Sequence, residues 1–194
     1  MSRLPRDIVP WEKIGGETVL AERFGKRFVT QDFRNPRTGM IEEFALFGHH
    51  DWVVVLAVTT DGLVITNHEY KQGCDRILHE LPAGKIEPDD EDPAARMRIE
   101  LREEAGYEAD QVTFLGPPMF MSTRSSWTRF HPYLALNCRE VGEQDLDESE
   151  DIARELIPLE RWIALCLNEV VVPSAIVATF RALSHLGYSF IPPA

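Results

Sequence analysis

The sequence predicts an α/β fold in which a mixed β-sheet is packed between helices. Residues 52–59 are a dense run of β-branched residues, which is typical of a buried strand. Residues 93–105 predict an acidic helix with a small apolar packing surface. Two further helices are expected near the C-terminus, over residues 159–167 and 174–186. This mixture of strands, a central helix and two late helices favours an α/β sandwich.

The composition limits the classes of partner. The chain has 194 residues, which suits one domain with a real core. Its net charge of −12 disfavours nucleic acids and anionic membranes, because binding their phosphates needs basic patches. A small phosphate ligand remains compatible with this charge, since Mg²⁺ bridges an acidic protein and an acidic substrate. No run of about 18 apolar residues is present, so we expect no membrane span.

The cysteines and the first residues favour a cytoplasmic protein. Cys74, Cys138 and Cys166 are widely spaced and form no Cys-x-x-Cys pair, which favours reduced thiols. Residues 1–13 lack the apolar segment of a secretory signal. We therefore expect a cytoplasmic location.

The chain divides into an N-terminal extension over residues 1–48 and a main domain over 49–194. Residues 1–16 are polar and are expected to be loosely ordered. Alternating apolar and polar residues over 18–32 predict one or two strands, and residues 40–46 predict a returning strand. The extension is therefore expected to be a small β-hairpin.

The main domain is expected to continue with a series of strands and to close with an apolar helical stripe. The predicted strands cover residues 63–70, 78–81, 111–115, 119–121, 130–137 and 153–159. The stripe, which we assign to the core, consists of Ile176, Val177, Phe180 and Leu183. His131, within a predicted strand, is expected to be structural rather than catalytic.

The acidic helix carries the strongest chemical signal. Glu100, Glu103 and Glu104 are spaced so that their carboxylates share one side of an α-helix. Like charges there cost stability, and the usual compensation is a bound cation. Oxygen-only ligands favour Mg²⁺ or Mn²⁺. Asp92 is expected to cap the start of the helix, and Gly106 to end it.

Two motifs resemble those of a known family. Residues 100–107 (ELREEAGY) resemble the second half of the Nudix box, and residues 80–84 (ELPAG) resemble the ADP-ribose pyrophosphatase branch of the Nudix hydrolases. The resemblance covers about residues 50–186. It implies a Nudix-type α/β/α sandwich with a mixed sheet.

The chain departs from the Nudix box in two places. One extra residue lies between Gly84 and Glu91. Ile99 stands where the family has the Arg that orients the catalytic carboxylates. Arg96 lies one helical turn before Glu100, so we expect an i,i+4 pair in which Arg96 partly substitutes for that Arg.

The resemblance also implies roles for individual residues. Metal ligands would be the Ala83 carbonyl, Glu100, Glu104 and Glu150. Glu103 would be a catalytic residue that holds the metals together with Glu100 and Glu104. Residues 143–151 form a second acidic cluster, which alone is typical of a solvated loop. Because this cluster follows the expected strand, the resemblance assigns the catalytic base to Glu148 and a further metal ligand to Glu150. The alignment leaves a shift of two residues open, which would exchange these two roles.

Four residues are candidates for binding substrate. Lys71 stands where the family has an Arg, and meets a substrate phosphate or is an ordinary surface lysine. Glu80 lines the pocket in the family, although a Glu at a strand end is often solvated. In the loop 122–129, Arg124 is a candidate for holding a phosphate and Trp127 for stacking on a base. The alternative for both is a surface loop with one half-buried aromatic residue.

The function implied is metal-dependent hydrolysis of the pyrophosphate in a nucleoside diphosphate linked to another moiety. ADP-ribose or a nucleotide sugar is the expected substrate, and a nucleoside monophosphate and a sugar phosphate are the products. The alternative is a Nudix-fold sensor that binds a nucleotide sugar without cleaving it, which Ile99 motivates. The resemblance also implies a homodimer.

Overall fold

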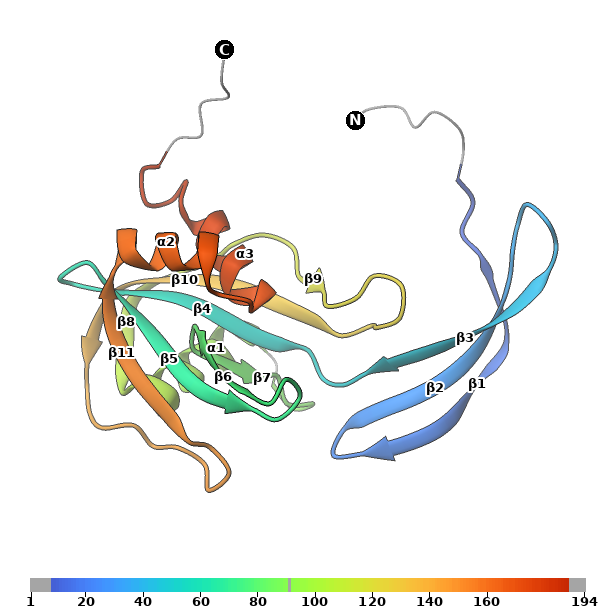
Figure 1. The fold of residues 1–194 in the computed structure, drawn as a ribbon, viewed down its shortest axis with the longest axis horizontal. Coiled ribbons are helices and arrows are strands. Elements are labelled where there is room, and N and C mark those ends of the chain that lie inside the picture. Colours follow the sequence, from blue (N-terminus) through green and yellow to red (C-terminus); the bar gives the residue numbers. More distant parts are fainter. Residues whose placement is uncertain (1–7, 91, 189–194) are drawn as a thin grey trace, which may run out of the picture. The chain divides into compact units, whose positions relative to one another are not determined.

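The computed structural model describes residues 8–90 and 92–188, which form two compact units (Figure 1). The N-terminal unit contains the residues up to His50 together with Phe120–Thr128. The main unit contains Asp51–Met119 and the residues from Arg129 onward. The segment at 120–128 had been assigned to the main domain from the sequence.

The N-terminal unit is a three-stranded antiparallel sheet in the order β1-β2-β3, which agrees with the expected one or two strands followed by a returning strand. Its strands are β1 (Glu12–Arg23), β2 (Lys26–Arg34) and β3 (Ile41–Gly48). A tight turn at Phe24 and Gly25, both with positive φ, separates β1 from β2. The expectation of loose order was wrong for the residues from Glu12 onward, which pair with β2. Residues 1–7 lie outside the described part of the chain.

The main unit contains a mixed sheet, as predicted. Its strands are β4 (Trp52–Thr59), β5 (Leu63–Lys71), β6 (Arg76–Glu80), β7 (Ala83–Lys85), β8 (Tyr107–Phe114), β10 (Arg129–Glu140) and β11 (Ile152–Pro158). The short strand β9 (Met119–Phe120) follows β8 in the sequence and pairs with β10. The order of the main strands is β11-β5-β4-β10-β8. Strands β4 and β10 run parallel, whereas β5 runs antiparallel to β4, β6 and β11.

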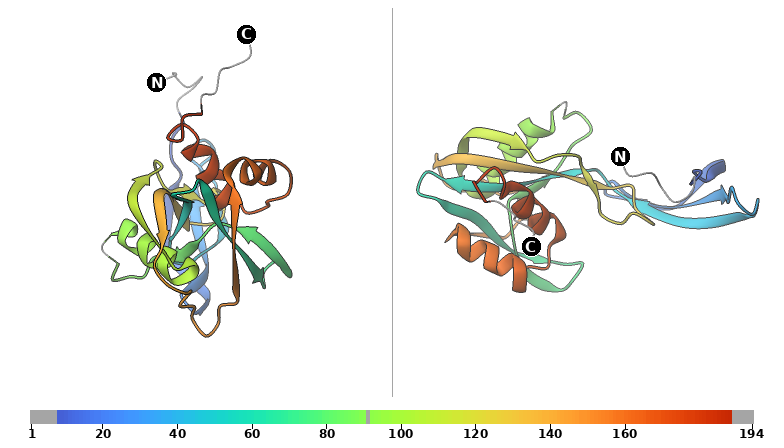
Figure 2. Two further views of the ribbon diagram at one scale, coloured as in Figure 1. Left: turned by 90° about the vertical axis from the view of Figure 1, so that its left-hand side faces the viewer. Right: turned by 90° about the horizontal axis from the view of Figure 1, so that it is seen from above.

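The three helices cover both faces of this sheet (Figure 2). Helix α1 (Pro93–Ala105) covers the face that we call the α1 face. Helices α2 (Leu159–Asn168) and α3 (Pro173–Ala182) cover the other, which we call the α2 face. None of the three described helices is long and apolar enough to cross a membrane.

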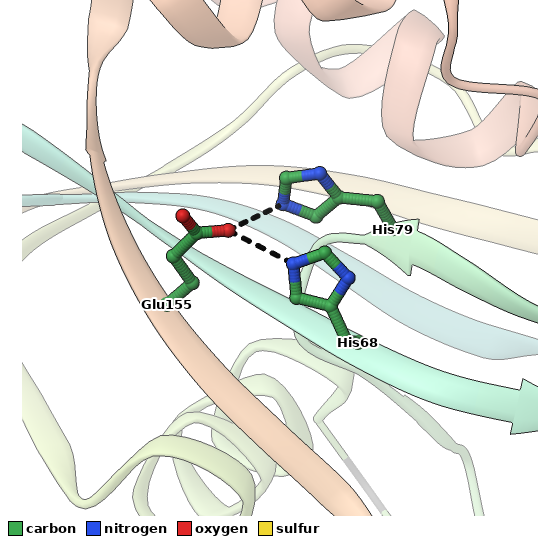
Figure 3. A group of neighbouring side chains, drawn as sticks. All are labelled: His68, His79 and Glu155. Atoms are coloured by element: carbon green, nitrogen blue, oxygen red, sulfur yellow. Dashed lines mark hydrogen bonds and ion pairs between the residues drawn. The ribbon is translucent and has the colours of Figure 1, made fainter.

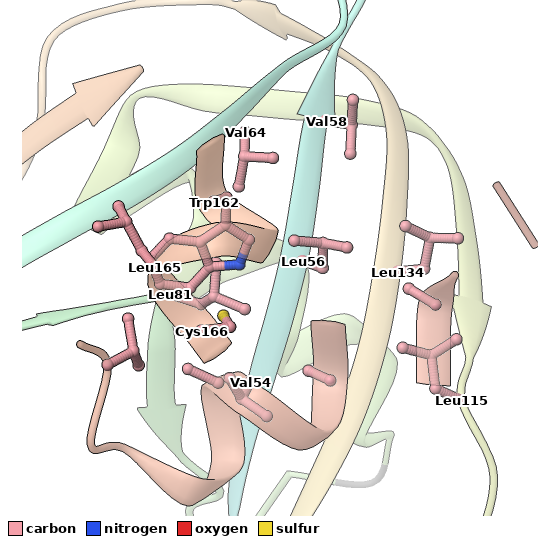
Figure 4. Packing of buried hydrophobic residues seen from close by; sticks show 14 of the residues in the cluster. Val54, Leu56, Val58, Val64, Leu81, Leu115, Leu134, Trp162, Leu165 and Cys166 are labelled. Atoms are coloured by element: carbon pink, nitrogen blue, oxygen red, sulfur yellow. The ribbon is translucent and has the colours of Figure 1, made fainter. Parts of the chain in front are cut away.

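Strand β4 supplies both cores because neighbouring residues of a strand point to opposite faces. Val53 and Val55 pack with Met97 and Leu101 of α1. Val54, Leu56 and Val58 pack on the α2 face with residues that include Trp162, Leu165 and Cys166 (Figure 4). Full burial of each large apolar side chain contributes about 1.5–3 kcal/mol. The sandwich is therefore held together by two apolar layers.

Helix α1 has the bounds that the sequence predicts. Asp92 caps it by accepting a hydrogen bond from the Ala94 N–H, and Gly106 ends it in the left-handed conformation with φ 73°. Helix α3 differs from the prediction, because it ends at Ala182 rather than Leu186. Its most buried face includes small residues, such as Ala175 and Ala178, whereas most of the predicted stripe is only partly buried.

Candidate active site

Two glutamates of α1 are buried, which is unusual for carboxylates. Glu100 and Glu104 are each 5% exposed and lie one helical turn apart. Glu103 is on the same helix but is about half exposed. The structure thus brings together the three carboxylates predicted from spacing, and it buries two of them in the main unit.

Glu104 is held by two strands of the sheet. Its Oε2 accepts hydrogen bonds from Nδ2 of Asn67 on β5, at 2.9 Å, and from the backbone N–H of Ala83 on β7, at 3.0 Å. Burial raises the pKa of Glu104 well above its usual range, and the negative charges of Glu100, Glu80 and Glu150 add to this effect. A bound cation would offset both the burial of the Glu104 carboxylate and its repulsion by the neighbouring charges.

Glu100 is held by Arg96, as the sequence analysis predicts. The Arg96 Nε donates to Glu100 Oε1 at 2.7 Å, and another guanidinium nitrogen is 2.5 Å from the same oxygen. The guanidinium is also 4.0 Å from Glu103 Oε2. Burial raises the pKa of Glu100, and Arg96 opposes that rise. Ile99, at the family's Arg position, is 41% exposed.

Gly84 makes room for the Glu100 carboxylate. Gly84 lies in β7, opposite Val53 of β4. A Cβ added to Gly84 would lie 1.6 Å from Cδ of Glu100, which no real contact allows. The extra residue after Gly84 therefore does not remove the glycine from the place where the carboxylate needs it.

The donor set fits a hard divalent cation. Glu100 and Glu104 offer carboxylate oxygens around Gly84, and Ala83, a predicted ligand, contacts Glu104. Within residues 8–90 and 92–188, Asn67 Oδ1 is a buried oxygen that has no hydrogen-bond partner. Oxygen donors alone are the preference of Mg²⁺ and Mn²⁺. These residues are therefore suited to hold such an ion.

The loop before β11 is anchored to α1. The backbone N–H of Asp145 donates to the Glu103 carbonyl at 2.9 Å, and the Gln144 side chain donates to the Glu104 carbonyl at 2.5 Å. Gln144 could not be predicted as part of the site, because nothing in the local sequence pattern distinguishes its amide side chain from those of its neighbours.

A turn in this loop separates Glu148 from Glu150. The N–H of Glu150 donates to the Asp147 carbonyl at 2.9 Å, and the Glu150 side chain accepts from the Asp147 N–H at 3.1 Å. Glu148 is exposed at the tip of the turn. Glu150 is partly buried, and its charge helps to raise the pKa of Glu104, for which burial is the main cause.

Lys71 and Glu80 form a pair beside the carboxylates. Lys71 Nζ is 2.7 Å from Glu80 Oε1 and also bonds to Glu69, which the sequence analysis missed. Glu80 lies opposite Asn67 in the β5–β6 pairing and is only 9% exposed, so it is not a solvated strand end. Burial raises the pKa of Glu80, and Lys71 opposes that rise.

Arg124 and Trp127 belong to the N-terminal unit. They line one pocket of about 510 Å³ together with Lys13, Arg27 and Glu17, and Glu17 is ion-paired with Arg27. Trp127 packs so closely on Gly48 that a Cβ there would lie 2.4 Å from the indole ring. The structure thus brings the two loop residues into one partly cationic cavity.

Comparison with known proteins assigns this architecture to a family. The sequence model of the NUDIX domain matches residues 48–172. An ADP-ribose pyrophosphatase of Bacillus subtilis (strain 168) is 33% identical over 118 residues, which are 60% of this chain and 63% of that protein. An ADP-ribose pyrophosphatase of Mycobacterium tuberculosis (strain ATCC 25618 / H37Rv) is 27% identical over 148 residues, 75% of this chain and 70% of that protein.

Two further comparisons extend this result. A methanol dehydrogenase activator of Bacillus methanolicus is 32% identical over 77 residues, 40% of this chain and 41% of that protein. The chain therefore spans less than two thirds of this relative and of the Bacillus subtilis relative. A solved structure titled "Crystal structure of ADP compounds hydrolase" matches with a TM-score of 0.80 and 17% identity, covering 94% of this chain and 97% of the other. This likeness supports the fold.

Proposed function

Because the chain belongs to the NUDIX family, we propose that it hydrolyses the pyrophosphate of a nucleoside diphosphate linked to a second moiety, with Mg²⁺ or Mn²⁺. ADP-ribose or a nucleotide sugar is the proposed substrate, since two relatives are ADP-ribose pyrophosphatases. The observation that carries the proposal is the burial of Glu100 and Glu104 around Gly84, with Arg96 and Asn67 holding them.

The carboxylates of α1 have one task in this reaction, which is to hold the cation against the substrate phosphates. When bound, the cation would neutralise charge that develops on the phosphate oxygens and would lower the pKa of the attacking water. Arg96 keeps Glu100 oriented, and Asn67 with the Ala83 N–H keeps Glu104 oriented. Glu150, whose charge acts on both carboxylates, is the proposed further ligand.

Glu148 is the proposed general base that takes the proton from the attacking water. Its exposed position at the tip of the Asp147–Glu150 turn supports this role, because an unburied carboxylate on a surface loop is free to meet a bound substrate. A base within hydrogen-bond reach of the water contributes about 10²–10⁴-fold to such rates. Glu103, which is about half exposed on the same face of α1, is proposed to assist Glu100 and Glu104 in holding the cation.

Substrate contacts are proposed in both units. Lys71 and Glu80, which are paired beside Glu104, are proposed to contact the substrate in the main unit. Arg124 and Trp127 are proposed to hold a phosphate and a base through the N-terminal pocket. The cationic residues and the indole ring of that pocket support this assignment.

A homodimer is the proposed assembly. The strands of the N-terminal unit expose several large apolar side chains, and apolar surface is a feature of many protein–protein contacts when it forms a patch. These side chains are Val19, Leu20, Phe28, Ile41 and Phe47. A second copy covering them would remove this surface from water, and light scattering coupled to gel filtration would measure the resulting mass.

The cytoplasm is the proposed location. Cys74, Cys138 and Cys166 are all free thiols in the structure, which suits a reducing compartment. Fractionation of cells that express the tagged protein tests this proposal directly.

The deciding experiment is hydrolysis of a substrate panel. ADP-ribose, several nucleotide sugars, a dinucleoside polyphosphate and a nucleoside triphosphate are incubated with Mg²⁺, with Mn²⁺ and with chelator, and the products are identified by mass. We expect a nucleoside monophosphate and a sugar phosphate only when metal is present. Binding of one member by calorimetry without any turnover would contradict the proposal and favour a sensor.

A matched pair of variants separates base from ligand. Glu148→Gln is expected to lower kcat while leaving the dependence on metal concentration unchanged, because only the proton acceptor is lost. Glu150→Gln is expected to raise the metal concentration needed for half-maximal rate. The reverse pattern would exchange the two assignments.

A further inference from the structure

Three side chains with metal-binding atoms meet on the α2 face, away from the carboxylates of α1. They come from three adjacent strands: His68 from β5, His79 from β6 and Glu155 from β11 (Figure 3). In the sheet, His79 lies opposite His68, and Glu155 lies opposite Thr66, two residues before His68. Side chains at such positions share one face, so the register itself assembles the cluster.

The ligand atoms converge on a small volume. Nε2 of His68 is 2.8 Å from Oε2 of Glu155, and Nε2 of His79 is 3.7 Å from the same oxygen. One ligand atom from each residue lies within 4.8 Å of the others. Around a tetrahedral ion with bonds of about 2.0–2.2 Å, ligand atoms are separated by roughly 3.3–3.6 Å. The two separations from Glu155, 2.8 and 3.7 Å, bracket this range, and binding would require the stacked rings of His68 and His79 to turn until both nitrogens face the ion.

The neighbours of His79 hold its ring in place. The Trp162 ring meets the imidazole edge-on with centroids 5.1 Å apart. Thr66 Oγ1 is 2.8 Å from Nε2 of His79, the nitrogen that faces Glu155, so an ion bound there would replace this hydrogen bond. The rings of His68 and His79 are stacked at 4.0 Å. Burial lowers the pKa of His79, and the neighbouring His68 lowers it further. Neutral imidazole is thus favoured, and it is the form that binds metal ions.

The cluster is open to solvent on one side. The side chain of Glu155 is about half exposed. A pocket of about 210 Å³ adjoins His79 and is also lined by Glu169, a further carboxylate. An ion entering here would therefore keep a position for water or for an additional ligand.

We propose that His68, His79 and Glu155 form a second metal site, one that takes a borderline transition-metal ion of the zinc class. Two imidazole nitrogens with one carboxylate are a donor set that such ions prefer, whereas Mg²⁺ prefers oxygen alone. The site is independent of the proposed hydrolase activity. It would tie together β5, β6 and β11 and so stabilise the strand that carries Asn67, the partner of Glu104.

Cobalt and zinc test the site directly. The full chain is titrated with Co²⁺ in excess Mg²⁺, which occupies oxygen-only sites, and visible absorption from nitrogen-ligated cobalt is followed. Zn²⁺ is then added and is expected to displace the signal. His68→Gln and Glu155→Gln are each expected to weaken binding at least about tenfold, since even residues that only orient a ligand change metal affinity by that factor.

His185→Gln is the matched control, because His185 is an exposed histidine outside the cluster. Zn²⁺ is expected to raise Tm in the wild type and in this control but not in His68→Gln, since ligands stabilise the state they bind. Circular dichroism in chelator establishes that each variant is folded. Absence of the cobalt band in the wild type, or equal Zn²⁺ responses of His68→Gln and His185→Gln, would overturn the proposal.

Discussion

The two faces of the main sheet carry different chemistry on the same strands. Asn67 and His68 are neighbours on β5, yet Asn67 contacts Glu104 on the α1 face and His68 contacts Glu155 on the α2 face. The α1 face gathers buried oxygen donors, whereas the α2 face gathers two imidazoles and a partly exposed carboxylate. Strand alternation thus allows one sheet to hold two donor sets that suit different cations.

The faces also differ in how much space surrounds the donors. On the α1 face, Gly84 lets the Glu100 carboxylate lie against β7 without clash. On the α2 face, the histidine cluster adjoins an open pocket. Adding a single methyl group at Gly84 should therefore damage the α1 face and leave the α2 face intact.

Gly84→Ala tests this difference and has the largest expected effect among the changes that leave every carboxylate in place. Its Cβ would displace the Glu100 carboxylate, so we expect turnover to fall by about 10²-fold or more, because small misplacement of positioning groups is costly in catalysis. Gly73→Ala is the control, since a Cβ at Gly73 meets nothing within 4 Å. Equal turnover in the two variants, measured with ADP-ribose and Mg²⁺, would contradict the crowding argument.

Arg96→Ala removes the only cationic side chain that the described residues place on Glu100. We expect kcat/KM to fall about 10- to 100-fold, equivalent to the roughly 1.5–3 kcal/mol of a hydrogen bond to a charged group. Arg98→Ala and Arg102→Ala are the controls, because Arg98 bonds to the Ala109 carbonyl and Arg102 to Glu108. Small and equal effects of all three would refute the idea that Arg96 substitutes for the family's Arg.

Glu104→Gln tests the α1 face through the thermal stability of the metal-free protein. Burial raises the pKa of Glu104, so the charged form destabilises the metal-free fold. The neutral amide removes that cost, and its oxygen can still accept from Asn67 Nδ2 and the Ala83 N–H. In chelator we expect a gain of about 1 kcal/mol, or a Tm rise of about 2–4 °C. A lower Tm than wild type would mean that the carboxylate stabilises the fold without metal.

The thiols give the smallest expected effect. Burial raises the pKa of Cys138 on the α1 face to about 12, from 9.0, and also raises the pKa of Cys166 on the α2 face. Both should resist an alkylating reagent at pH 8, while exposed Cys74 reacts. Between pH 9 and 12 the unfolded chain loses the Cys138 proton that the folded chain keeps, so stability should fall as pH rises. Rapid labelling of three thiols in the native protein would contradict this.

The α1 face could be predicted from the sequence because the residues that form it lie close together in the chain. The bounds of α1, its Asp92 cap and the pairing of Arg96 with Glu100 all follow from spacings within one helix. The histidine cluster could not be predicted from the sequence. His68 and Glu155 are 87 positions apart, and the three residues come together only through the pairing of their strands. Likewise, no local pattern indicates that residues 120–128 pack with the N-terminal strands.

The measurement that tests the central claim most directly is turnover of ADP-ribose by the wild type and by Glu104→Gln, side by side at saturating Mg²⁺. Arg102→Ala, an exposed change on the same helix, serves as the control. We predict that the wild type and Arg102→Ala release AMP and ribose phosphate, while Glu104→Gln is slower by about 10³-fold, because cation stabilisation supplies several kcal/mol. Undiminished turnover by Glu104→Gln would show that the buried carboxylates of α1 are not the catalytic centre.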